Sequence, residues 1–114
     1  MASVTVTITD ITKGPFCVAT LFKGGTIAGI TLVPAAPATP PRIANELTVQ
    51  ADPSNGSAQV YWGDKNLTPT SNATGIVLNP WDSHTKHNIP LAGEYVNASA
   101  NGAKLDMSAD GGFQ

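Results

Sequence analysis

Hydrophobic and polar residues alternate with a period of two along the first part of the chain. Residues 3–11 read SVTVTITDI, which puts Val4, Val6 and Ile8 on one face and threonines on the other. Successive side chains of a strand point to opposite faces of a sheet. The pattern therefore predicts a half-buried β-strand that extends from the N-terminus.

Two further apolar runs, residues 16–22 and 26–33, predict a second and a third strand. Residues 34–41 read PAAPATPP, and proline lacks the amide hydrogen that a helix or a central strand needs. We expect an extended, proline-rich linker there, which divides the chain into an N-terminal part, residues 1–33, and a C-terminal part, residues 42–107. Because the first part is too short to bury a core alone, it is expected to dock on the second part or on a neighbouring molecule.

The C-terminal part is predicted to be a series of short strands between turns. The expected strands are 42–51, 57–62, 75–78, 89–91, 94–98 and 103–107. Asn101-Gly102 predicts a tight hairpin, and residues 108–114 are expected to form a flexible tail. The fold class is all-β: a compact antiparallel β-sandwich or barrel-like domain with an extended N-terminal strand.

Composition excludes several classes of function. The chain has 114 residues, with six basic and eight acidic residues and a net charge of −2, so it lacks the clustered Lys and Arg of a nucleic-acid binder or a polybasic membrane binder. No run approaches the roughly 18 apolar residues of a membrane-spanning helix. The first residues lack the pattern of a secretion signal, which predicts synthesis in a host cytoplasm. The single cysteine excludes an intrachain disulfide.

Side chains with catalytic or metal-binding chemistry are scattered. His84 and His87, with Asp82 nearby, are the only candidate metal ligands, but the short spacing in an expected loop favours a solvated segment. Cys17 has apolar neighbours, which favours a small core residue over a reactive thiolate. We therefore expect a protein that is not an enzyme and has no catalytic, cofactor or metal site.

The aromatic residues Tyr61, Trp62 and Trp81 are the side chains best suited to supply binding energy. Aromatic rings at the rim of a sandwich can stack on a sugar ring. They can also fill the core or an intersubunit contact, and we favour this second use for Trp62, which shares a strand face with Val60.

Three segments of residues 42–107 resemble, in order, those of a known family. They are NGSAQVYWGDK at 55–65, GIVLNP at 75–80 and EYVNASANGAKL at 94–105. The series is similar to that of small bacteriophage virion proteins of the capsid decoration (cement) or head-fibre type. The chain departs from the family pattern at 81–87, WDSHTKH, where a shorter turn is expected.

The resemblance implies a compact β-sandwich and a structural role on the capsid surface. Such a protein stabilises the assembled phage head by bridging neighbouring major capsid subunits, commonly as a homotrimer. The expected interface residues are Val4, Val6, Ile8, Tyr61, Trp62 and Trp81, the first three on a strand that would join an adjacent sheet. The alternative is a receptor- or glycan-binding module, such as a head-fibre or tail-associated adhesin.

Overall fold

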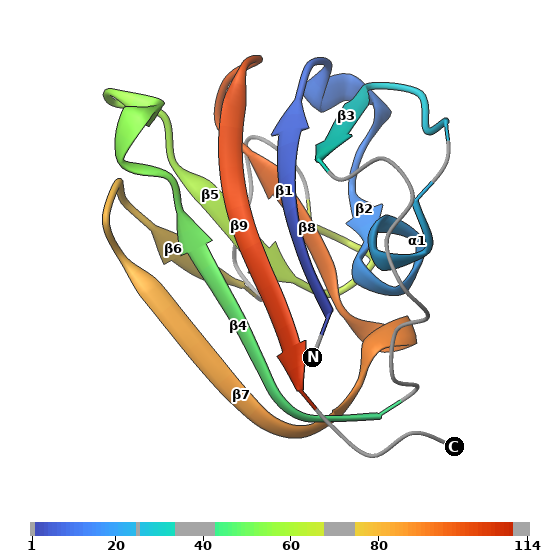
Figure 1. Cartoon of the computed structure of the whole chain (residues 1–114). Helices are drawn as coiled ribbons and strands as arrows, with labels where there is room; N and C mark the ends of the chain where they lie inside the picture. Colours follow the sequence, from blue (N-terminus) through green and yellow to red (C-terminus); the bar gives the residue numbers. More distant parts are fainter. Residues whose placement is uncertain (1, 25, 34–42, 68–74, 111–114) are drawn as a thin grey trace.

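Two antiparallel β-sheets pack face to face in the computed structural model, which describes residues 2–24, 26–33, 43–67 and 75–110 (Figure 1). Sheet A has five strands in the spatial order β3 (Ile30–Val33), β1 (Ala2–Ile8), β9 (Ala103–Asp110), β4 (Ile43–Ala51) and β7 (Ser83–Pro90). Sheet B has four strands in the order β2 (Phe16–Cys17), β8 (Tyr95–Ala98), β5 (Val60–Gly63) and β6 (Ile76–Leu78). The remaining elements are α1 (Val18–Lys23) and three 3-10 turns, η1 (Ile11–Lys13), η2 (Pro53–Asn55) and η3 (Leu91–Gly93). The predicted all-β sandwich is confirmed.

Strand β1 lies inside sheet A, between β3 and β9. Its register places Thr5 opposite both Val33 and Asp106. The alternation of its side chains puts three residues into the core between the sheets: Val4, Val6 and Ile8, of which the last two are fully buried.

Of the two expectations for the N-terminal part, docking on the C-terminal part of the same chain is the one that the structure shows, so the expectation of a separate N-terminal arm is corrected. Strands β1 and β3 share one sheet with β4 and β9. The prolines end the local strand pattern, but they do not prevent the segments before and after them from pairing. The predicted linker at 34–41 lies outside the described residues, as do residues 111–114 of the predicted tail, whose first three residues belong to β9.

Two elements differ in type from the prediction. Residues 16–22 form the short strand β2 followed by helix α1, in which Val18, Leu21 and Phe22 are buried at helical spacing. Six residues are too few for that period to be recognised in the sequence. Residues 83–88, expected to be loop, form strand β7 together with residues 89–90 of the expected strand 89–91, and β7 pairs with β4 at the edge of sheet A; residue 91 begins η3.

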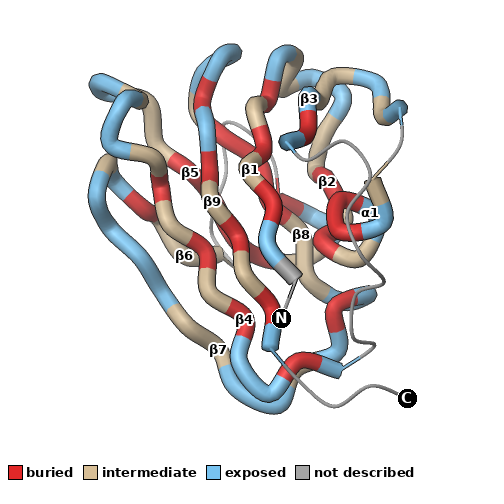
Figure 2. The backbone as a smooth tube through the Cα atoms, in the orientation of Figure 1, coloured by how far each residue is buried: buried red, intermediate tan, exposed pale blue. Residues whose placement is uncertain are grey.

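The core lies between the sheets and consists mainly of Val, Leu and Ala side chains. Buried and exposed residues alternate along β1, β9 and β4, as Figure 2 shows. Trp62 of β5 and Phe22 of α1 are the largest fully buried side chains. The inner face of sheet A is thus apolar along β1, β9 and β4, and the outer face of these strands carries their polar residues.

Candidate functional site

The turn between β6 and β7 presents an exposed tryptophan. Trp81 is 72% exposed and has a φ of 79°. Its amide donates a hydrogen bond to the carbonyl of Ala51, and the amide of Ala51 donates to the carbonyl of Asp82, at 3.1 and 3.0 Å. The carboxylate of Asp82 also accepts a hydrogen bond from the amide of Asn79, at 3.0 Å. The turn is therefore fixed to the end of β4.

A positive φ is uncommon for a bulky residue, because the Cβ atom crowds the backbone. Such a conformation persists only where its surroundings hold it, and it occurs preferentially at functional sites. At Trp81 the hydrogen bonds of the turn supply that restraint. The ring is thus held outward by a rigid backbone, an arrangement typical of an interface anchor.

The outer face of sheet A is the second candidate surface, and polar side chains cross all five of its strands. One row of the register joins Ser83, Gln50, Asp106, Thr5 and Val33. This face contains a hollow of about 270 Å³. Six polar residues contribute to its lining: Ser3, Thr5, Thr48, Gln50, Asp106 and Ser108.

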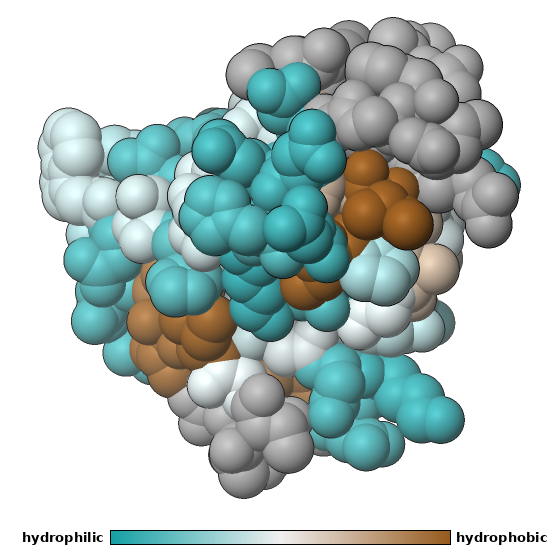
Figure 3. All heavy atoms as spheres, turned by 90° about the horizontal axis from the view of Figure 1, so that it is seen from below, coloured by the Kyte–Doolittle hydropathy of each residue, from teal (hydrophilic) through white to brown (hydrophobic). Residues whose placement is uncertain are grey.

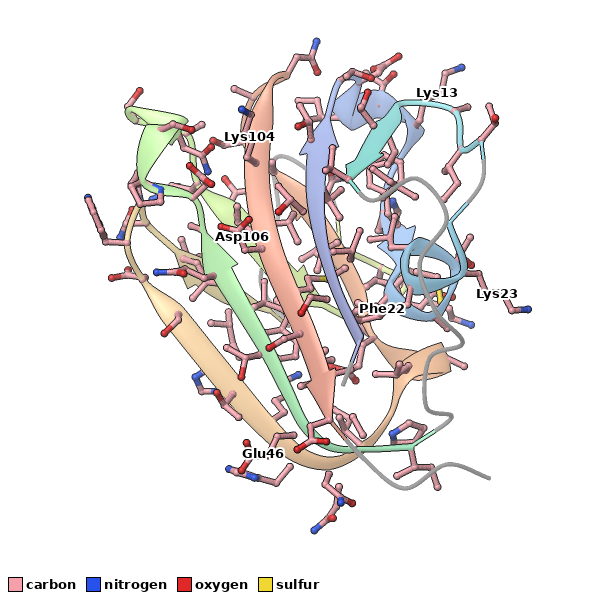
Figure 4. All side chains as sticks on the ribbon, in the orientation of Figure 1. Lys13, Phe22, Lys23, Glu46, Lys104 and Asp106 are labelled. Carbon is pink, nitrogen blue, oxygen red and sulfur yellow. The ribbon has the colours of Figure 1, made fainter. Side chains whose placement is uncertain are left out.

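Asp106 supplies the carboxylate of the hollow and lies on the same face of β9 as Lys104 (Figure 4). The Thr5 hydroxyl donates a hydrogen bond of 2.8 Å to its Oδ1. Burial raises the pKa of Asp106 above 3.8, the Thr5 hydrogen bond partly opposes this, and the charge of Asp52 raises the pKa again. The pKa of Asp52 is lowered instead, because the hydroxyl and the amide of Ser54 both donate hydrogen bonds to it. Two neighbouring carboxyl groups are thus shifted in opposite directions.

A third cluster joins the two sheets through Trp62. The indole Nε1–H of this buried side chain donates to Oε1 of Glu94, at 2.8 Å. The same oxygen accepts a hydrogen bond from Lys86 Nζ at 2.8 Å, and that ammonium lies 4.6 Å from the centre of the indole ring. The ring of His84 meets the indole edge-on, with the centroids 5.8 Å apart. The Lys86 ammonium and the His84 ring, both on β7, thus contact Trp62 and attach β7 to sheet B.

The two histidines lie on opposite faces of β7. His84 pairs with the buried Val49 and points toward Trp62, whereas His87 pairs with Glu46 on the outer face. Residues three apart on a strand cannot direct their side chains to one point. Among the residues that the structure describes, no group of three or more His, Cys, Asp or Glu side chains is arranged to hold a metal ion.

Five of the six predicted interface residues lie in the interior of this chain. Val4, Val6 and Ile8 are core residues of β1, and Trp62 is fully buried between the sheets. Tyr61 is 9% exposed, so only Trp81 presents a large surface to a partner. Of the two alternatives left open for Trp62, the core and an intersubunit contact, its full burial within this chain agrees with the core. Cys17 is half-buried, with its sulfur 3.6 Å from the carbonyl oxygen of Ala92.

The hollow was not predicted, because strand pairing assembles it from residues far apart in the sequence. Thr5 and Thr48 stand at polar positions of alternating segments, which indicates an outer face. Gln50 and Asp106 lie 56 positions apart in the sequence and become neighbours only in the register of β4 and β9. No motif marks their proximity.

Comparison with known protein families, with curated proteins and with solved structures found no match. None of the helices in the described residues is long and apolar enough to cross a membrane.

Proposed function

We propose that this chain is a non-enzymatic phage virion protein, a capsid decoration protein that stabilises the assembled head. The proposal places it on the capsid surface, as a homotrimer that bridges neighbouring major capsid subunits. It rests on the ordered resemblance of residues 42–107, and the structural observation that carries it is the exposed, rigidly held Trp81.

Trp81 has the properties of a binding anchor. Covering the exposed share of a tryptophan side chain is worth about 3–4 kcal/mol before the costs of association. Since the backbone hydrogen bonds already fix the turn, little conformational freedom is lost on binding. A protein that binds only the assembled shell stabilises it by mass action, which is the physical basis of decoration.

The proposed attachment uses the surface of the sandwich and not a donated strand. Strand β1 is paired on both sides within its own sheet, so it is not free to join a neighbour. Large exposed hydrophobic side chains in the described part of the chain are few and separate: Val33, Ile43 and Trp81. Seen from below, the hydrophobic atoms form separate patches on a mostly hydrophilic surface (Figure 3). The contact is therefore expected to consist of a small apolar anchor surrounded by polar residues.

Co-sedimentation with the heads of the phage that encodes the chain tests this proposal. The protein should pellet with expanded heads, not with unassembled shell protein, and should raise the temperature at which the heads lose DNA. Trp81→Ala should weaken retention at least about tenfold. The control Ile43→Thr removes another exposed hydrophobic group and should change retention less than about twofold.

Either of two results would overturn the proposal: wild-type protein that does not pellet with heads, or Trp81→Ala protein that pellets equally well. The trimer is tested separately by sedimentation equilibrium, which should give three times the mass of one chain. A monomer at the concentrations used for head binding would contradict that part.

A further inference from the structure

The hollow on the outer face of sheet A has the chemistry of a site for a polar ligand. Hydroxyl groups of Ser3, Thr5, Thr48 and Ser108 surround it, and short side chains of this kind leave the sheet surface accessible. Its volume of about 270 Å³ lies near the roughly 300 Å³ lower end for ligand pockets. It therefore suits a single small ring better than a protruding part of another protein.

Two longer polar side chains in the hollow can together donate and accept hydrogen bonds. One N–H of the Gln50 amide donates to the carbonyl of Trp81 at 3.4 Å, which leaves a second donor and an acceptor for a ligand, and the Asp106 carboxylate offers acceptor lone pairs. The register sets these groups side by side on adjacent strands, about 5 Å apart, with Thr5 next in the same row. A ligand with hydroxyl groups at regular intervals matches such a row, since each hydroxyl both donates and accepts.

Charge in the lining disfavours an anionic ligand, although Lys104 lies two residues from Asp106 on the same face of β9. Asp106 is the only charged residue among the described residues that line the hollow. A phosphate or sulfate group would be repelled by this carboxylate and would find no cation in the lining. At one end of the row Val33 is 64% exposed and offers an apolar surface for the C–H face of a ring.

We infer that the outer face of sheet A binds a neutral polysaccharide, with Gln50 and Asp106 hydrogen-bonding the hydroxyl groups of one sugar ring and Val33, two strands beyond Asp106 in the same row, contacting the apolar face of a neighbouring ring. The hollow adjoins the proposed head attachment, because the Gln50 amide also donates to the carbonyl of Trp81, but Trp81 is not among the described residues that line it. A second copy of the chain is a poorer match, because the lining residues Val4 and Met107 are buried and offer no apolar core for an interface.

Affinity electrophoresis tests the inference with defined probes. The wild-type chain is run through native gels that contain dextran, mannan, galactan or, as an anionic comparison, dextran sulfate. At least one neutral polysaccharide should retard it, with a dissociation constant of about 0.1–1 mM per sugar ring, as expected for a shallow single site. Dextran sulfate should cause no retardation.

Two variants and a matched control locate the site. Asp106→Ala and Gln50→Ala should each weaken retardation at least about tenfold while far-UV circular dichroism stays that of the wild type. The control Glu46→Gln alters a carboxylate on the same outer face of β4, outside the lining of the hollow. It should change the retardation by less than about twofold. If Asp106→Ala fails to fold, the retardation of Gln50→Ala alone tests whether the hollow binds the polysaccharide.

The inference is overturned if no neutral polysaccharide retards the wild type, if only dextran sulfate does, or if both variants bind as the wild type does. Asp106→Ala removes none of the hydrogen bonds of the Trp81 turn, so its co-sedimentation with heads reports separately on the proposed virion role, whereas Gln50→Ala also removes a hydrogen bond to the Trp81 carbonyl. A variant that loses sugar binding but still binds heads supports two separate sites. If the wild-type protein fails to bind heads but binds the polysaccharide, the sugar site is still supported.

Discussion

The two tryptophans of the chain occupy opposite environments, although both were candidates for the same role. Trp62 alternates with Val60 on a strand, and its burial follows from that pattern. Trp81 stands beside Pro80 in a turn, where no periodicity indicates the direction of the side chain. Its exposure and its positive φ follow from hydrogen bonds to β4, which the sequence around it does not reveal.

This difference predicts different stability losses. Trp62→Ala removes a fully buried side chain and should lower the free energy of unfolding by about 3–5 kcal/mol, a large part of the roughly 5–15 kcal/mol of a small domain. Trp81→Ala should change it by less than about 0.5 kcal/mol. Urea unfolding followed by far-UV circular dichroism measures both. Similar losses for the two variants would contradict the assignment.

Asp106 makes stability depend on pH in a defined direction. Its pKa is raised in the folded state, so its contribution is present below about pH 3.8 and is lost as the pH rises through the folded pKa. Asp106→Asn keeps an acceptor for the Thr5 hydroxyl but cannot ionise. The variant should therefore melt about 1–2 °C higher than the wild type at pH 7, a small effect because the group is partly exposed, and equally at pH 3. A lower melting temperature at pH 7 would contradict this account.

At the scale of the elements, strands with alternating or apolar patterns were predictable and the others were not. Strands β1, β4 and β9 have one buried and one exposed face, which the sequence shows directly. Strand β7 has one neighbour only and stays polar along much of its length, so its sequence resembles a loop. Helix α1 is too short for its period to be recognised. Pairing partners, and with them the hollow, depend on tertiary contacts that local patterns do not contain.

The attachment of β7 to sheet B yields a prediction about two neighbouring charges. Glu94→Ala leaves the buried indole N–H of Trp62 and the ammonium of Lys86 without their acceptor, and should lower the unfolding free energy by about 1–3 kcal/mol. Lys86→Met keeps an unbranched chain over the indole and leaves the Trp62–Glu94 hydrogen bond in place. Its unfolding free energy should therefore fall by less than that of Glu94→Ala. Urea unfolding compares the two variants. A larger loss for Lys86→Met would show that the cation, and not the acceptor, dominates the cluster.

Lys86 has a second effect at the same scale. It points inward from the edge strand of sheet A, and an inward-pointing charge on an edge discourages pairing with another chain. The Lys86→Met protein should therefore aggregate faster than the wild type under mildly destabilising conditions. Light scattering during incubation in low urea measures this, and unchanged aggregation would assign Lys86 a role in local packing alone.

At the scale of the whole molecule, the described residues before and after the proline-rich segment form one core. Strands β1 and β3 make up one side of sheet A, and α1 contributes Leu21 and Phe22 to the interior. A chain of residues 43–114 should therefore lack cooperative structure, and the full chain should unfold in one calorimetric transition. A truncated chain that melts cooperatively with β-rich circular dichroism would restore the interpretation of an independent N-terminal arm.

The register of β1 with β9 sets Ala2 directly opposite Ala109, although the two stand at opposite ends of the described sequence. Opposed residues on paired antiparallel strands have Cα atoms only about 5 Å apart. A short glycine linker can therefore join Ala2 to Asp110 without moving either strand. New ends opened at the Asn101-Gly102 turn, where Gly102 is exposed and a side chain would meet no neighbouring atoms, would give a circularly permuted protein with the same strand pairing among the described residues. Tags or cargo fused there would leave the molecule from the end of the sandwich opposite to Ala2 and Ala109.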